Sequence, residues 1–144
     1  MKRSSLYVLA AALLAAFTLA LLPTQQPVSA DEDGQKAIME AMEVLNGNYR
    51  KVRRQMSKAD QNADTANLLA EMIDASVMSK AHLPKTASTD ELKDSYRVVM
   101  NKLIIALAQA ENAALEGDND KLREFVLEAN QVKGEGHELF IADE

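Results

Sequence analysis

The chain has 144 residues and a formal net charge of −6, with 22 acidic residues, 16 basic residues and no cysteine. An acidic chain of this kind lacks the concentrated positive surface that marks a nucleic-acid-binding protein. Without cysteine there is no disulfide, no thiolate chemistry and no covalent Cys-x-x-Cys-His attachment of a c-type haem.

The first thirty residues are typical of a cleaved signal peptide. A basic start (MKR) precedes an apolar run over residues 7–22, and residues 28–30 (VSA) have the small-x-small pattern of a cleavage site. The apolar run is short for a transmembrane span. A retained N-terminal anchor is the alternative. We expect an exported, periplasmic protein that starts near Asp31, with no stable membrane insertion after signal removal.

The predicted mature domain, residues 31–144, keeps all 22 acidic but only 14 basic residues, so its net charge is −8. Its first two helices are predicted from apolar periodicity. The first has steps of four and three through Ile38, Met42, Leu45, Tyr49, Val52 and Met56. The second, capped by Asn62 or Asp64 and continuing to about Lys80, has a core face of Leu69, Met72, Ile73 and Ser76 with Val77 alongside.

Two further helices follow the segment around Pro84. A capping box of Ser88 and Glu91 starts the third, whose core face reads Leu92, Tyr96, Val99, Leu103, Ala106, Ala110 and Ala113. Gly117 closes it and Asp118 can cap the fourth, with Leu122, Phe125, Ala129, Val132, Gly136 and Leu139 along its seam. Four amphipathic helices with short connections predict an all-α, antiparallel up-down-up-down four-helix bundle.

Candidate chemistry is limited to thioether and imidazole groups. Met42 lies near the start of the first helix and His137 near the end of the fourth, and these ends meet at one end of such a bundle. Facing each other there, they could bind a haem iron from both sides, and a six-coordinate site of this kind favours electron transfer over oxygen chemistry. Taken singly, the methionine is typical core filler and the histidine typical of a surface or satisfied residue.

Two of the five glycines, Gly134 and Gly136, lie beside His137. Glycine is unfavourable inside a helix, so their presence needs a reason. One interpretation is that they leave space for a porphyrin next to its ligand. The other is that they mark a fraying helix end. His137 lies one position off the strict seam, which continues through Gly136 and Leu139.

These residues resemble those of the soluble cytochrome b562 family of four-helix-bundle cytochromes. The segment MEVLNGN (residues 42–48) is similar to the first-helix segment that carries the family's axial methionine, and GHELF (residues 136–140) resembles the segment with its axial histidine. The LEGDNDKL turn (residues 115–122) is similar as well. The resemblance covers essentially the whole of residues 31–144.

The resemblance implies one non-covalent b-type haem per chain, with Met42 and His137 as axial ligands of the iron. Lys133 takes the place of a basic residue that family members often carry four positions before the histidine. Gly136 replaces the family's aromatic just before the histidine, and the resemblance places Tyr96 where aromatics line the haem in relatives. The implied function is electron transfer rather than catalysis, as a monomer that exchanges electrons with unidentified redox proteins.

Three alternatives stay open. The chain could be a haem-free exported bundle that acts as a binding or structural protein. Met78 and His82, four residues apart, could form a soft-metal pair, although His82 is more typical of a loop. The basic residues of segment 50–54 are typical of a solvated face, or they could steer an acidic redox partner or a haem propionate, although their distance from Met42 disfavours the propionate.

Overall fold

The computed structural model describes residues 32–141, which form four long helices and one short 3-10 turn with no strand between those limits. The elements are α2 (Glu32–Gln55), η1 (Ala59–Gln61), α3 (Asn62–Lys80), α4 (Asp90–Glu116) and α5 (Asn119–Phe140). The proposed signal peptide, residues 1–30, lies outside the described residues. The four-helix architecture predicted from periodicity is confirmed.

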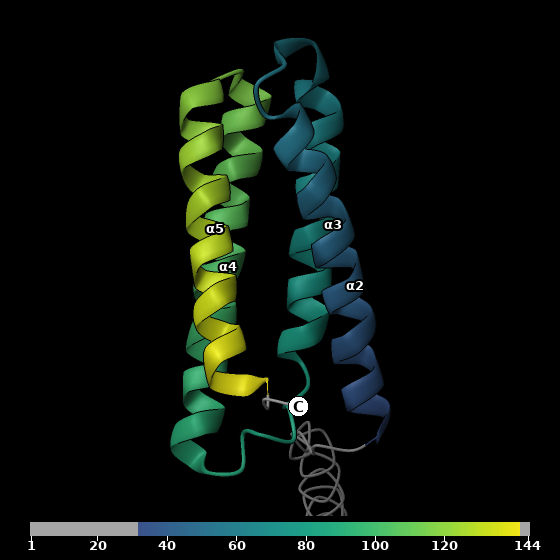
Figure 1. The fold of residues 1–144 in the computed structure, drawn as a ribbon, viewed down its shortest axis with the longest axis vertical. Coiled ribbons are helices and arrows are strands. Elements are labelled where there is room, and N and C mark those ends of the chain that lie inside the picture. The colour runs from purple at the N-terminus through teal and green to yellow at the C-terminus, as the bar shows by residue number, and fades with distance from the viewer. Residues whose placement is uncertain (1–31, 142–144) are drawn as a thin grey trace, which may run out of the picture.

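The helices run up and down in turn, and the main packing contacts are α2 on α3, α3 on α4, and α4 on α5. Figure 1 shows the start of α2 and the end of α5 at the same end of the bundle, far apart in sequence but on neighbouring sides of the molecule. This is the arrangement that an antiparallel bundle requires. It brings the two segments that carry Met42 and His137 to one end.

Local signals account for most of the helix limits. Acidic Glu32 and Asp33 lie in the first turn of α2 and basic Arg53 and Arg54 in its last turn, which complements the helix dipole. Gly117 ends α4 with a left-handed φ of 75°, a conformation that costs glycine little. The Asp118 side chain then accepts a hydrogen bond from the Lys121 backbone nitrogen at 3.1 Å and caps α5.

Two predicted caps were wrong. Thr89, not Ser88, is the N-cap of α4, and its hydroxyl oxygen accepts from the Leu92 backbone nitrogen at 3.2 Å. Helix α3 begins after Gln61 without any side-chain cap. The preceding turn η1 leads the chain directly into α3, since the Asn62 backbone N–H bonds to Ala59 O.

The most deeply buried large apolar side chains belong to all four helices. They are Val52, Leu69, Leu107, Leu122 and Val126. Around them, α4 presents a run of small residues, Ala106, Ala110, Ala113 and Ala114, which are essentially inaccessible and let neighbouring helices approach closely. Helix α4 is also long and apolar enough to cross a membrane by length and composition, and 44% of that stretch is buried inside the bundle.

The strict seam predicted for the fourth helix was wrong at two places. The prediction placed Phe125 in the core, but Val126 is buried and Phe125 is only partly buried. It also placed Leu139 there, but Leu139 is 51% exposed and Phe140 is 8% exposed. Steps of three and four average 3.5 residues per turn, and a helix has 3.6, so a strict seam drifts around the helix by about 20° per heptad. The core-facing stripe of α5 therefore advances by one residue, which moves His137 toward the interior.

Candidate functional site

A cavity of about 340 Å³ lies at the end of the bundle where α2 begins and α5 ends. Its walls are overwhelmingly apolar, as is usual for small-molecule and cofactor sites of this size. Helices α2, α4 and α5 supply nearly all of the lining. The lining residues are Ile38, Met39, Met42, Glu43, Asn46, Pro84, Tyr96, Val99, Met100, Leu103, Lys133, Gly136, His137, Phe140 and Ile141.

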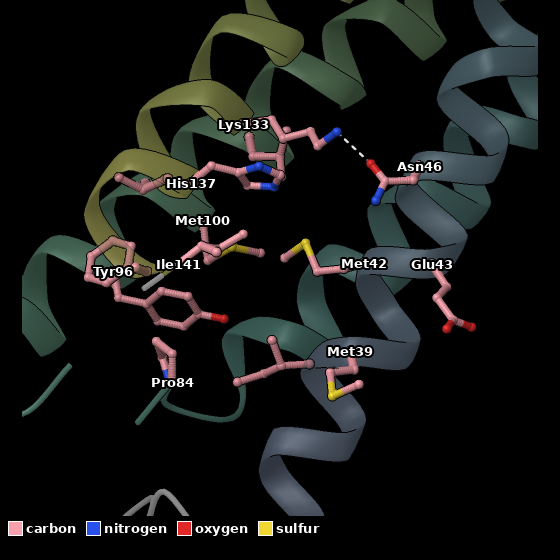
Figure 2. Close-up of a pocket in the computed structure, with 15 residues that line it drawn as sticks. Met39, Met42, Glu43, Asn46, Pro84, Tyr96, Met100, Lys133, His137 and Ile141 are labelled. Carbon is pink, nitrogen blue, oxygen red and sulfur yellow. Dashed lines mark hydrogen bonds between the residues drawn. The ribbon is translucent and has the colours of Figure 1, made fainter. Parts of the chain in front are cut away.

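The four residues proposed from the sequence, Met42, Lys133, Gly136 and His137, all line this cavity. Figure 2 shows Met42 reaching in from α2 and the His137 ring from α5, on opposite sides of the space. Both side chains are half-buried. The first and last helices thus bring one thioether and one imidazole to the same cavity.

Burial lowers the pKa of His137 from its usual 6.5, and the nearby Lys133 ammonium lowers it further. Both effects favour the neutral imidazole. A neutral imidazole has a free nitrogen lone pair, which is the form that binds metals. The environment therefore favours the protonation state of His137 that can bind a metal.

Lys133, one helical turn before His137, lies at the rim of the cavity. Its ammonium donates a hydrogen bond to Asn46 Oδ1 on α2, which Figure 2 shows as a bridge from one wall to the other. Burial lowers the pKa of Lys133, and the charge of Arg50 adds to the effect. The rim thus holds a half-buried cation whose one polar partner in the described chain is neutral.

The glycines have different surroundings. A Cβ at Gly136 would lie 3.2 Å from Val99 Cγ1, so glycine keeps α5 close to α4 beside the cavity. A Cβ at Gly134 would meet nothing within 4 Å, and the residue is exposed. The space-making role expected of Gly134 was therefore wrong. The fraying interpretation was wrong as well, because α5 continues to Phe140.

The connection between α3 and α4 borders the cavity through Pro84. Gln35 on α2 holds this loop with both ends of its amide: Nε2 donates to Leu83 O at 2.8 Å, and Oε1 accepts from the Lys85 nitrogen at 3.2 Å. The Thr86 hydroxyl donates to Phe140 O at 2.7 Å. The loop is thereby tied to the start of α2 and to the end of α5. Periodicity gave no signal for these contacts.

Tyr96 lines the cavity from α4, where the resemblance placed an aromatic. Its hydroxyl donates to Ser79 O at 2.9 Å and lies 2.9 Å from Ser79 Oγ. Its ring meets Phe140 edge to face, with centroids 5.3 Å apart. Burial raises the pKa of Tyr96, so the hydroxyl stays protonated and joins α4 to α3 behind the cavity wall.

The other candidates lie elsewhere. Met78 is 58% exposed, and His82, in the loop after α3, does not line the cavity. Within residues 32–141 no three histidine, aspartate or glutamate side chains gather as a metal-binding group. Met100, 3% exposed, is a lining thioether that the sequence analysis did not single out.

Comparison with known proteins identifies the family of the chain. A sequence model of the Cytochrome b562 family matches residues 37–140, a span that includes all four proposed site residues. No curated protein matches the chain. No solved structure matches it either. Because the family model covers well over half of the sequence, this chain belongs to the cytochrome b562 family, which suggests a haem-binding, electron-carrying cytochrome.

Proposed function

We propose that the chain is a periplasmic electron-transfer protein that binds one b-type haem non-covalently, with Met42 and His137 as the axial ligands. One observation carries this proposal: a thioether from the first helix and an imidazole from the last enter the same apolar cavity from opposite sides. The resemblance of the segments 42–48 and 136–140 to the ligand-bearing segments of the family supports the same pair.

The residues around the cavity suit a porphyrin. Apolar side chains from three helices would cover the macrocycle and exclude water, and Met42 and His137 are both neutral donors. When bound, haem supplies a one-electron iron couple, and Met/His ligation raises its potential relative to other haem ligand sets. Gly136 leaves room beside the histidine, because a larger residue there would press on Val99.

Lys133 is the candidate partner for the carboxylates of the cofactor. It lies at the rim, half-buried, and carries the positive charge nearest to His137 along α5. In this role, Lys133 would exchange its hydrogen bond to the neutral Asn46 amide for one to a carboxylate, in which both the donor and the acceptor are charged. The lysine would then fix the orientation of the bound group.

The export route, partners and oligomeric state are part of the proposal. The signal-like pattern of residues 1–30 supports export. With Met42 and His137 as the two axial ligands, no open coordination position would remain for a substrate, which fits a carrier rather than an enzyme. A monomer that exchanges electrons with other redox proteins is the expected working form.

The test is haem binding followed by potentiometry on the protein that starts at Asp31. We expect saturation at one haem per chain, narrow low-spin bands in both oxidation states, and a reversible one-electron titration. Absence of saturable binding would retire the proposal and leave a haem-free bundle. Binding with a spectrum typical of an open coordination position would show that one of the two ligands is wrong.

A further inference from the structure

Three arginines form a ridge on the outer surface of α2. Arg50, Arg53 and Arg54 are all exposed and, with Tyr49, line a shallow depression of about 310 Å³. Their spacing of three and four residues places them on one face of the helix. We call this set (Arg50, Arg53 and Arg54) the arginine ridge.

The positive charge of the arginine ridge is not neutralised within residues 32–141. None of the ion pairs in this part of the chain involves the three arginines, whereas Arg97, Lys93 and Lys121 each have a carboxylate within 2.9 Å. The chain as a whole carries a net charge of −6. The three arginines therefore produce a local positive potential on the surface of a chain whose net charge is negative.

The arginine ridge continues to the rim of the cavity. Asn46, one helical turn before Arg50, lines the cavity and accepts the hydrogen bond from Lys133. Arg50 lies close enough to Lys133 for its charge to act on that ammonium. A positive strip thus runs from beside His137, across the rim and along α2.

We propose that the arginine ridge forms the docking surface for an acidic redox protein, which exchanges electrons with the cofactor at the adjacent rim. The inference rests on the proposed function. Charge complementarity specifies the partner, since the net negative charge of the chain would repel an acidic protein whereas this basic cluster would attract it. Binding of the cofactor carboxylates does not explain all three arginines. At a rise of 1.5 Å per residue, Arg53 lies about 16 Å along the helix from Met42, too far to contact a cofactor bound there.

The first test measures the charge felt at the site of electron exchange. Reduced, haem-loaded protein is mixed with ferricyanide, which takes one electron and becomes ferrocyanide, or with the cation tris(phenanthroline)cobalt(III), which is reduced to cobalt(II). If exchange occurs beside the ridge, added salt slows the reaction with ferricyanide and speeds the reaction with the cobalt complex. The opposite salt dependence for both reagents would show that the net negative charge governs exchange, and would overturn the proposal.

Arg50→Glu and Arg123→Glu make a matched pair. Both replace an exposed arginine and change the net charge equally, but Arg123 lies near the start of α5, away from the cavity. We expect Arg50→Glu to slow the ferricyanide reaction by about tenfold at low salt, with little effect of Arg123→Glu. Equal effects of the two substitutions would contradict a local docking site.

A second measurement identifies the class of partner and does not depend on haem. Amide signals are followed by NMR while the redox-inactive trianion hexacyanochromate(III), or a flavodoxin as an acidic redox protein, is added. We expect broadening or shifts confined to residues 49–54 and around Lys133. Effects spread over other surfaces, or binding to anionic phosphatidylglycerol vesicles without binding to flavodoxin, would overturn the proposal. Failure to load haem would retire the proposed function, and this measurement would still decide whether the ridge binds acidic partners.

Discussion

Lys133 on α5 donates a hydrogen bond to Asn46 on α2 across the mouth of the cavity. The main packing of these two helices is with α3 and α4, so the bond links the two outer helices directly at the point where a cofactor would enter. It also holds a positive charge one turn from His137. We therefore expect this bond to contribute to the stability of the haem-free protein.

Asn46→Ala is expected to destabilise the haem-free protein. The substitution leaves the half-buried Lys133 ammonium without its acceptor, and the loss of one such bond costs about 1 kcal/mol. Urea unfolding should show a lower midpoint with an unchanged slope. Asn130→Ala, at an exposed position on the same helix as Lys133, serves as the control and should cause no loss. Equal midpoints for the two variants would show that the bridge contributes nothing.

His137 should make the stability of the haem-free protein depend on pH. Its folded-state pKa is lowered, first by burial and second by Lys133, so the unfolded chain binds the proton more readily. The resulting stability is fully present above the unfolded pKa of about 6.5 and is lost as the pH falls from there toward the folded pKa. Urea unfolding at a series of pH values between 4 and 8 measures the effect.

His137→Gln should remove this pH-dependent component, whereas His82→Gln should retain it. Lys133→Gln should raise the pKa of His137 in an NMR titration of the haem-free protein, because the repelling ammonium is gone. A histidine pKa that stays unchanged or falls in that variant would mean that Lys133 does not act on the ring.

Gly134→Ala and Gly136→Ala should have different effects although they lie two residues apart. Alanine at position 134 has open space and should stabilise the helix by about 0.5 to 1 kcal/mol. Alanine at position 136 would press on Val99, so it should stabilise less or destabilise, and should weaken haem binding by pushing Val99 into the cavity. Thermal unfolding and haem titration of both variants check this, and identical behaviour would rule out a packing role for Gly136.

Tyr96→Phe should loosen the wall behind the cavity. The substitution removes one of the donors to Ser79 O, which keeps its hydrogen bond from the His82 nitrogen, and also removes the partner of the buried Ser79 Oγ. Leaving that hydroxyl unpaired costs about 1 to 3 kcal/mol. The ring and its contact with Phe140 remain, so a fall in the unfolding midpoint would isolate the contribution of the hydroxyl. A variant as stable as the wild type would show that water replaces these bonds at no cost.

The buried positions were predicted best where a periodic apolar pattern runs uninterrupted through a buried helix. All but the first of the predicted core positions of α4 are buried, because its long apolar stripe faces both α3 and α5. In α5 the strict seam selected Leu139, and the structure buries Phe140. The same rotation explains why His137, one position off that seam, lines the cavity.

The remaining features of the site depend on contacts between distant segments. The amide of Gln35 binds a loop about fifty residues away, and nothing in the spacing of either segment indicates the pair. The bridge from Lys133 to Asn46 is of the same kind. The N-cap of α4 was predicted one residue too early, at Ser88 instead of Thr89, because neighbouring serine, threonine and aspartate side chains all suit the position.

Met42 and His137 are proposed to bind the haem iron together, and the most direct test is an optical haem titration of four variants. Met42→Ala and His137→Ala should each abolish the low-spin spectrum and weaken binding. Met39→Ala, which removes a neighbouring exposed thioether on the same helix, and His82→Ala should each keep the wild-type spectrum and affinity. A low-spin spectrum that survives the loss of Met42 or His137 would contradict the account.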